Sequence, residues 1–376
     1  MNESFKTKIN YNESLTNLAC SIKKYFELDY NHQTLNYVDD ILDEKKPDNV
    51  ILLLCDGLGS RILNQILDKN SFLIKNRRKE IYSVFPPTTA SSLNSIKTGL
   101  NPSEHGWIGW TSYIQLIDKI ILLYKDKEKG KSEIDEDFIN IKKKYFEHKS
   151  ITDLINDKGK FKSYEISCYP YNVDKDIDSV LNKILEKLKI EGKKYIFAYY
   201  PEPDDILHEF GVKSENAKIE IEKINKKIQE FSKKLDKKTI MFIVSDHGHL
   251  ISPRISIKNS KIQQFMKVDK MFIENRSPSF LIKEDKIEEF KKVFNEEFGN
   301  DFYLLSKEEV LKYNIFGEYN KKHELLNSSI GDFLAISKDT SDKSLVDDYD
   351  SYNFSSHGGY SDDELFIPLI IISNNN

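Results

Sequence analysis

Continuous apolar runs alternate along the chain with charged segments of helical periodicity. The apolar runs are rich in Val, Ile, Leu and Phe, which favours strands, and they cover residues 49–55, 81–85, 163–168, 194–200, 238–245 and 366–372. Several are apolar at nearly every position, as is typical of parallel strands covered on both faces. The intervening segments Ile177–Glu191 and Ser214–Leu235 predict helices. The alternation predicts an α/β sandwich with a mainly parallel central sheet.

A second pattern occupies residues 276–338, where strand, helix, strand, helix and strand follow one another closely. The strands read SFLI, FYLL and FLAI, and the first helix reads KIEEFKKVFNEEF. We therefore predict a small α+β subdomain over residues 276–345, inserted into a core of residues 1–275 and 346–376. The segment Lys125–Lys144 is a dense mixture of charges and is expected to be a solvated excursion.

Composition and charge narrow the class of protein. With 376 residues, 39% hydrophobic and 12% aromatic, the chain can bury a large core. A net charge of −5 and an isoelectric point near 6.0 argue against general nucleic-acid binding. The N-terminal sequence lacks the apolar segment of a signal peptide, and no apolar run reaches the roughly 18 residues of a membrane span. Cys20, Cys55 and Cys168 form neither a disulfide framework nor a metal knuckle. We therefore expect a soluble cytoplasmic protein without a membrane partner.

Acidic residues, histidines and threonines follow the carboxyl ends of four of the predicted strands. A single Asp after a strand is usually a turn former or a helix cap. The carboxyl ends of parallel strands, however, meet at one edge of a sheet, where ligand sites are built. The joint arrival of these residues at that edge therefore indicates a functional site. The set comprises Asp56, Thr88, Thr89, Asp204, Asp205, His208, Asp246 and His247.

The chemistry of this set favours a metal site. Carboxylate oxygens and imidazole nitrogens bind zinc or manganese without the help of thiolates. Asp204 and His208 are spaced i, i+4 and would share one helix face, and Asp205 at i+3 is a compatible alternative. His357, in a glycine-rich turn before the last strand, is a further candidate, although a lone loop histidine is equally often a surface residue.

The stretch Ser83–Gly106 is crowded with hydroxyl side chains. It predicts a helix from about Ala90 to Lys97, with Thr88 or Thr89 at its N-cap. Such a helix end favours negative charge. A threonine hydroxyl held there by a metal would be a nucleophile. The alternative is that the hydroxyl only caps the helix.

Five ordered motifs resemble those of the alkaline phosphatase superfamily, and in particular its type I phosphodiesterase/nucleotide pyrophosphatase branch. The motifs are LLLCDGLGS, FPPTTASSLNSIKTGLNPSEHG, EPDDILHEFG, VSDHGHL and SSHGGYSDDELFIPLII. The resemblance covers residues 49–113 and 194–373, and it implies the fold of that superfamily.

The resemblance also implies a site that holds two divalent metal ions, zinc or alternatively manganese. One ion would be held by Asp56, Asp246, His247 and the nucleophile Thr89, and the other by Asp204, His208 and His357. The motif register selects Thr89 over Thr88 and Asp204 over Asp205. His105 and His249 match no ligand position and are expected to be structural, with His105 hydrogen-bonded to its own loop.

The implied reaction is hydrolysis of a small phosphorylated substrate, a phosphodiester or a nucleotide pyrophosphate, through a phosphothreonine intermediate. Ala90 and Trp110 stand where similar nucleotide pyrophosphatases carry Phe and a phosphate-binding Asn, so they are the candidate substrate contacts. No Arg lies between Ser83 and Tyr113 to clamp a terminal phosphate, which favours diesters. The alternatives are a phosphomonoesterase or phosphonate hydrolase, and a binding module without catalysis.

Aromatic side chains near the expected site could stack a nucleobase, since every base has a π face, or they could simply pack. They are Trp107, Trp110, Tyr113, Tyr169 and Tyr171.

Overall fold

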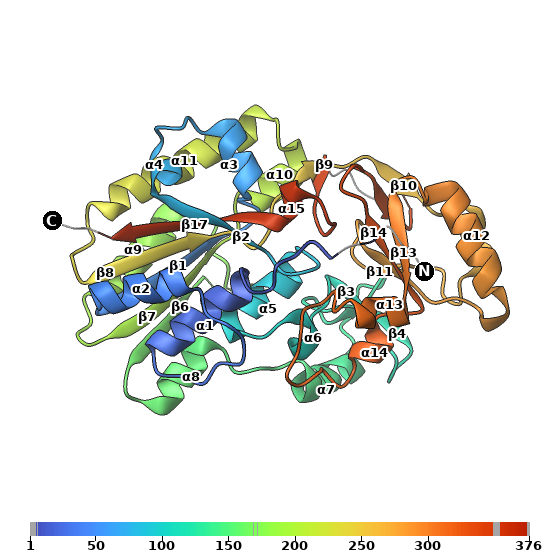
Figure 1. Ribbon diagram of the computed structural model, residues 1–376, viewed down its shortest axis with the longest axis horizontal. Coiled ribbons are helices and arrows are strands. Elements are labelled where there is room, and N and C mark those ends of the chain that lie inside the picture. The colour runs from blue at the N-terminus through green and yellow to red at the C-terminus, as the bar shows by residue number, and fades with distance from the viewer. Residues whose placement is uncertain (1–4, 6, 168, 171, 349–353, 374–376) are drawn as a thin grey trace.

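The computed structural model describes residues 5, 7–167, 169–170, 172–348 and 354–373. Its centre is a six-stranded sheet of order β2-β17-β8-β1-β7-β6, flanked by helices on both faces (Figure 1). The strands of this sheet are β1 (Asn49–Cys55), β2 (Arg77–Tyr82), β6 (Lys162–Ile166), β7 (Lys194–Tyr200), β8 (Thr239–Val244) and β17 (Phe366–Ser373). The predicted α/β fold with a mainly parallel central sheet is confirmed.

The innermost strand, β1, pairs in parallel with both β7 and β8, and every residue of it is buried. Its side chains alternate between two cores. Ile51 and Leu53 pack with the helices of one face, and Leu52 and Leu54 pack with those of the other. Burial on both faces explains why the strand is apolar throughout.

The helices on the two faces are amphipathic segments that cover these cores. One face is covered by α3 (Ser60–Ile66), α4 (Phe72–Asn76), α9 (Ile177–Leu188), α10 (Asp204–Phe210) and α11 (Glu215–Ser232). The other is covered by α1 (Leu15–Tyr25), α2 (Asn36–Lys45), α5 (Thr89–Thr98) and α8 (Ile151–Lys158). The predicted helices at 177–191 and 214–235 are therefore present as α9 and α11, each shorter at its C-terminal end.

Two strands differ from the sequence prediction. Strand β17 runs antiparallel to both of its neighbours, β8 and β2. Strand β2 spans Arg77–Tyr82, whereas residues 81–85 were predicted. As an edge strand, β2 is only partly buried and carries the charged residues Arg78, Lys79 and Glu80, so the apolar pattern pointed to the buried residues that follow it. The predicted strand 163–168 is observed as β6, and Cys168 lies outside the described residues.

A second, antiparallel sheet has seven strands in the order β13-β14-β12-β11-β3-β4-β5. They are β3 (Thr111–Ile114), β4 (Lys119–Leu122), β5 (Lys127–Glu128), β11 (Phe272–Ile273), β12 (Pro278–Phe280), β13 (Phe302–Ser306) and β14 (Phe333–Ser337). Helices α12 (Ile287–Phe298) and α13 (Lys307–Lys312) accompany it, as the pattern in 276–338 indicated. Since β3, β4, β5 and β11 lie outside residues 276–345, this sheet is larger than the predicted insertion, whose boundaries stay a prediction.

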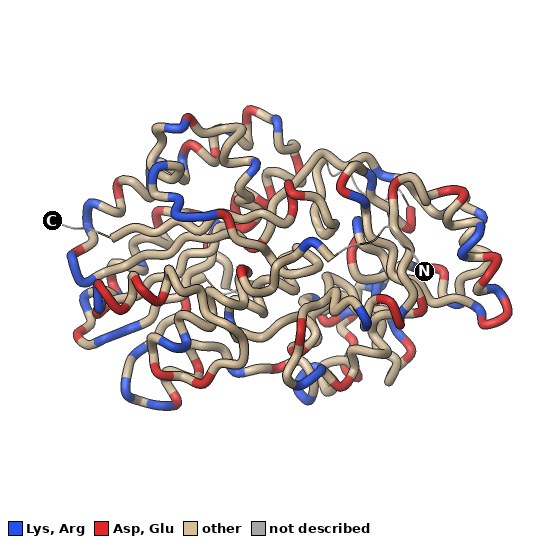
Figure 2. The backbone as a smooth tube through the Cα atoms, in the orientation of Figure 1, with Lys and Arg blue, Asp and Glu red and all other residues tan. Residues whose placement is uncertain are grey.

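The charged segment 125–144 contains more structure than a solvated excursion. It includes β5 and most of α7 (Glu136–Tyr145), and Phe138 is fully buried beside Trp107. The expectation is therefore wrong for α7, whose few apolar residues lie on one buried face among many exposed charges. Figure 2 shows acidic and basic residues interspersed over the outer helices and loops.

Short elements complete the fold. The helices are α6 (Pro102–His105), α14 (Leu326–Ser329) and α15 (Asp362–Leu365), with 3₁₀ turns at Lys261–Phe265 and Glu284–Lys286. Two small sheets pair β10 (Arg254–Ser256) with β15 (Ser344–Val346), and β9 (Leu250–Ile251) with β16 (Ser355–Ser356). None of the helices in the described part of the chain combines the length and the apolar character that a bilayer-spanning segment requires.

Candidate metal centre

The carboxyl edge of the central sheet brings the predicted residues together. Asp56 directly follows β1, and its amide continues the ladder by donating to the Tyr200 carbonyl (2.9 Å). The next residue, Gly57, has φ +72°, and a side chain there would approach the Asp204 Cα to 3.0 Å. Its amide donates to Asp246 Oδ1 (3.0 Å). Glycine at this turn therefore allows three strand ends to converge.

The first group of candidate ligands comprises Asp56, Asp246 and His247, all buried. His247 Nε2 lies 3.3 Å from Asp56 Oδ1 and 3.3 Å from Asp246 Oδ2. Asp246 Oδ1 accepts the amides of Gly57 and His247, whereas its Oδ2 is buried and has no hydrogen-bond partner among the described residues. A buried carboxylate oxygen without a partner costs free energy. A bound metal ion would remove this cost, so the oxygen fits the role of a metal ligand.

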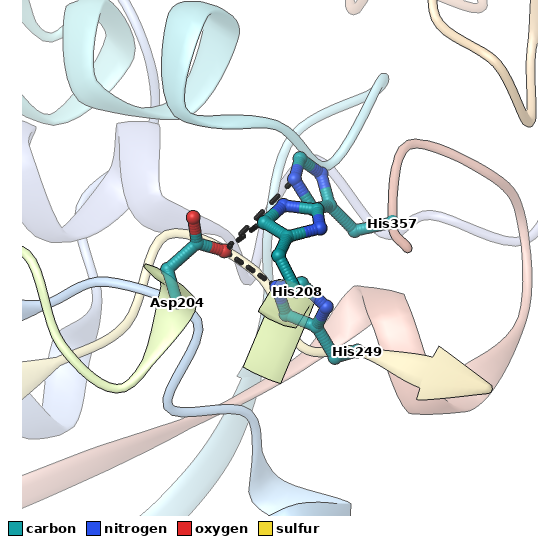
Figure 3. A group of neighbouring side chains, drawn as sticks. All are labelled: Asp204, His208, His249 and His357. Carbon is teal, nitrogen blue, oxygen red and sulfur yellow. Dashed lines mark hydrogen bonds and ion pairs between the residues drawn. The ribbon is translucent and has the colours of Figure 1, made fainter. Parts of the chain in front are cut away.

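The second group comprises Asp204, His208, His249 and His357 (Figure 3). Asp204 and His208 lie one turn apart on α10, as their spacing predicted, and His208 Nε2 is 3.6 Å from Asp204 Oδ1. His357 Nε2 lies 4.0 Å from the same oxygen. The pairing of β9 with β16 brings His249 and His357, at the ends of these strands, to the same place.

Hydrogen bonds to backbone carbonyls fix the histidine tautomers. Nδ1 of His208 lies 3.0 Å from the Ser355 carbonyl, Nδ1 of His247 lies 3.2 Å from the Gly248 carbonyl, and Nδ1 of His357 lies 3.1 Å from the Pro87 carbonyl. Because a carbonyl can only accept, each Nδ1 carries the hydrogen and each Nε2 presents a lone pair. These lone pairs face carboxylate oxygens, which is a favourable arrangement only around cations.

The pKa values of these groups also reflect their burial, and they agree with neutral imidazoles. Burial lowers the pKa of His208 to about 4 and that of His357 well below its usual value, so both imidazoles are neutral at pH 7. Burial, with the neighbouring Asp246 and Asp204, raises the pKa of Asp56 well above its usual value. Neutral imidazoles beside crowded carboxylates fit two divalent cations, one in each group.

Thr89 points into the first group. It is the first residue of α5, and the N-cap residue Thr88 makes no capping hydrogen bond through its side chain. Thr89 Oγ1 lies 3.4 Å from Asp56 Oδ2 and 3.4 Å from His247 Nε2. The interpretation that Thr89 only caps the helix is therefore not supported, since its hydroxyl contacts two candidate ligands.

Asp205, the alternative to Asp204, lies apart from both groups. Its exposed side chain pairs with Lys175 at 2.5 Å. Histidine His105 is structural, as expected: it is buried, and its Nδ1 accepts the Trp107 amide of the same loop (3.0 Å). Of the two aspartates, it is therefore Asp204 that lies in a candidate ligand group.

Ala90 and Trp110 do not belong to the candidate ligand groups. Ala90 is buried in a small apolar cluster with Trp107. Trp110 is half-buried; its ring centre lies 6.3 Å from that of Tyr169, and its amide donates to Glu274 Oε1 (2.6 Å). Their roles as substrate contacts stay predictions.

Three residues near the site were not foreseen as part of it. His249 joins the second group, and the only sequence signal was its position two residues after His247. The Tyr199 hydroxyl donates to Asp56 Oδ2, although an apolar run gave no hint of this. Glu274, held by the Trp110 amide, has its pKa raised to about 7 by burial.

A row of aromatic rings extends away from Asp56. Tyr199 is followed by Tyr169 (5.6 Å between ring centres), and Tyr169 lies 4.9 Å from Tyr124. Trp110 is the last ring of the row and lies beside Tyr124 and Tyr169. Tyr169 and Trp110 were predicted to stack a base or to pack; here they pack on one another, and Tyr171 lies outside the described residues.

Comparisons with known proteins identify the family and the fold. Curated protein sequences give no match. Among solved structures, murine ectonucleotide pyrophosphatase/phosphodiesterase 5, as an inactive variant in complex with AMP, is similar with a TM-score of 0.63 at 17% identity, over 85% of this chain and 87% of that one. The human protein of the same name is similar with a TM-score of 0.62 at 19% identity, over the same shares of the two chains. At these identities the likeness concerns the fold. The family model of type I phosphodiesterases/nucleotide pyrophosphatases matches residues 50–360, and the chain belongs to that family.

Proposed function

We propose that this protein is a two-metal hydrolase that cleaves phosphodiester or nucleotide pyrophosphate bonds with Thr89 as its nucleophile. One observation carries the proposal: the Thr89 hydroxyl lies 3.4–3.5 Å from the Asp56 carboxylate and from His247 Nε2, inside the first group of candidate ligands. We propose zinc as the ion in both groups, with manganese as the alternative.

Each of the two groups of candidate ligands would hold one ion. Asp56, Asp246, His247 and Thr89 would hold one, and Asp204, His208 and His357 the other. Bound divalent ions favour deprotonation of a coordinated hydroxyl and neutralise charge on phosphoryl oxygens.

Thr89 forms the covalent bond to the substrate in the proposed reaction. Its Oγ1 attacks phosphorus, the new Oγ1–P bond forms as the bond to the leaving oxygen breaks, and a water molecule then cleaves the phosphothreonine. Asp56 is the nearest carboxylate to the hydroxyl proton of Thr89. The N-terminus of α5 adds partial positive charge beside the phosphoryl group.

The charges around the site favour a diester over a monoester. Lys97 lies near the far end of α5 and pairs with Glu165 at 3.0 Å. Arg276 is fully buried in a pair with Glu364. These two cations are therefore engaged elsewhere and are not available to clamp the extra negative charge of a monoester.

We propose that the substrate carries an aromatic group such as a nucleobase. The support is the aromatic row that begins at Asp56, in which Tyr199 is buried but Tyr169 and Trp110 are half-buried and offer ring faces. AMP is the ligand of the similar murine structure. A small nucleotide is thus the substrate class to test first.

The test compares three substrates on the purified protein, with and without added zinc or manganese. We expect metal-dependent cleavage of bis-(p-nitrophenyl) phosphate that exceeds cleavage of p-nitrophenyl phosphate and of a phosphonate ester. Preference for the monoester or the phosphonate would favour the alternative hydrolases. Binding of AMP without turnover of any of the three would favour a binding module.

We also propose that the protein is cytoplasmic. Cys20 and Cys55 are buried free thiols, as suits a reducing compartment. Recovery of the protein in the membrane or extracellular fraction of its cells would contradict this.

A further inference from the structure

His249 is the one member of the second group to which the motifs assign no role. It lies in the turn between β8 and β9, its side chain is fully buried, and its Nε2 is within hydrogen-bonding distance of Asp204 Oδ1 (Figure 3). Its ring centre lies 4.6 Å from that of His208 and 4.9 Å from that of His357. It is therefore as close to the other members as they are to one another.

The contacts of Ser355 allow the ring hydrogen of His249 to lie on Nδ1. The Ser355 hydroxyl donates its single hydrogen to the Leu207 carbonyl. It can then only accept from His249 Nδ1, which lies 3.3 Å away. Without an ion, Nε2 of His249 donates a hydrogen to Asp204 Oδ1. With the hydrogen on Nδ1 instead, as in His208 and His357, Nε2 would present a lone pair to an ion held by Asp204.

An ion bound by Asp204 would take the place of the hydrogen that Nε2 of His249 donates, and the Ser355 hydroxyl would then accept the hydrogen on Nδ1. The donor atoms of Asp204, His208, His249 and His357 all lie within 4.8 Å of one another, a spacing that one ion can draw together. We infer that His249 is a fourth protein ligand of the ion in the second group. The inference rests on the proposed two-metal function and extends it.

The backbone around His249 is held firmly in place. The Gly248 amide donates to the Glu364 carbonyl (2.9 Å), and a side chain at Gly248 would collide with the Asp363 carbonyl at 2.0 Å. The same turn carries Asp246 and His247 of the first group. The turn thus supplies ligands to both ions, and His249 has little freedom to move away.

A fourth protein ligand changes what the second ion can do. Three imidazoles and one carboxylate favour zinc over magnesium, calcium or manganese, whereas the first group has two carboxylates and one imidazole. Four protein ligands also complete a tetrahedral zinc site, so a substrate oxygen could join only as a fifth ligand. His249 would therefore strengthen metal binding and make the two ions unequal.

The test measures zinc content and affinity by metal analysis and calorimetry, not turnover. We compare His249→Ala, His249→Gln and the control His148→Ala; His148 hydrogen-bonds the His105 carbonyl outside both groups. We expect wild type and the control to bind two zinc ions. Both His249 variants should keep one ion and bind the other at least about 10-fold more weakly.

The glutamine variant separates a ligand from a merely positioning residue, because its amide can still donate a hydrogen bond to Asp204. Wild-type affinity for both ions in His249→Gln would overturn the inference in favour of a positioning role. Two ions bound normally in both His249 variants would overturn it altogether while leaving the two-metal proposal intact. A wild-type protein that binds fewer than two zinc ions would contradict the proposed function itself.

Discussion

At the scale of single residues, the position of Thr89 decides the chemistry. Thr89→Ala should fold normally, because a lost helix-end hydroxyl costs about 1 kcal/mol, yet turnover should fall by several orders of magnitude because the covalent route is gone. Thr88→Ala is the matched control, and its turnover should change little, since the Thr88 side chain makes no cap. Thr89→Ser should retain measurable activity. Steady-state kinetics and mass spectrometry of a phosphorylated Thr89 peptide provide the measurement; near-normal turnover in Thr89→Ala would exclude the nucleophile.

Two ligand substitutions should distinguish the two ions. Asp246→Ala removes the buried oxygen without a partner and should weaken the ion beside Thr89. His357→Ala should weaken the other ion, because His357 belongs only to the second group. Each variant should lose turnover by several orders of magnitude, since the ions supply most of the charge stabilisation. Metal analysis that finds two full equivalents in both variants, together with normal turnover, would contradict the assignment.

At the scale of elements, sequence reasoning located the ligands better than it located the strands. Asp56 directly follows β1, Asp246 lies two residues after β8 and Asp204 four residues after β7, so the position of each strand end indicated where its carboxylate lies. The direction of β17 was not predictable, because a strand buried on both faces is apolar whether it runs parallel or antiparallel. The predicted position of the edge strand β2 was several residues too late, because its charged residues do not form an apolar run. His249 was missed because its place in the second group depends on the pairing of β9 with β16. Strands of two residues leave no recognisable pattern in the sequence.

The buried pair of Arg276 and Glu364 joins elements that the ligands depend on. Arg276 Nε lies 2.7 Å from Glu364 Oε1, and both side chains are fully buried. Glu364 also accepts the Gly359 amide (2.6 Å), two residues after His357. Arg276→Met leaves a buried carboxylate uncompensated and should lower the free energy of unfolding by about 3–5 kcal/mol. Arg61→Met, in a partly exposed pair with Glu80, should cost less than about 1 kcal/mol. Chemical denaturation measures both, and equal losses would contradict the argument.

At the scale of the whole molecule, the site lies where the two sheets meet. The central sheet supplies its carboxyl edge, and α5, α10, α15 and β9 lie between it and the antiparallel sheet (Figure 1). The antiparallel sheet contributes through its loops: Glu274 follows β11 and holds the Trp110 amide just before β3. Substrate preference should therefore depend on residues of both sheets, whereas metal binding depends on the central sheet and the loops around it.

Metal removal should destabilise the whole molecule in a pH-dependent way. In the metal-free protein, burial raises the pKa of Asp56 well above its usual value, with Asp246 and Asp204 adding to the effect. The folded chain then holds a proton that the unfolded chain releases, so stability falls as pH rises through the raised pKa. Buried His208, with its pKa lowered to about 4, acts oppositely only below its unfolded value of about 6.5. An ion that binds Asp56 must displace its proton, so proton competition weakens zinc binding at mildly acidic pH, where the unfolded carboxyl is already ionised. The melting temperature gained on adding zinc to chelated protein should therefore be larger at pH 8.5 than at pH 5. A gain that is equal at the two pH values, or smaller at pH 8.5, would mean that the carboxylates are not brought together by the ions.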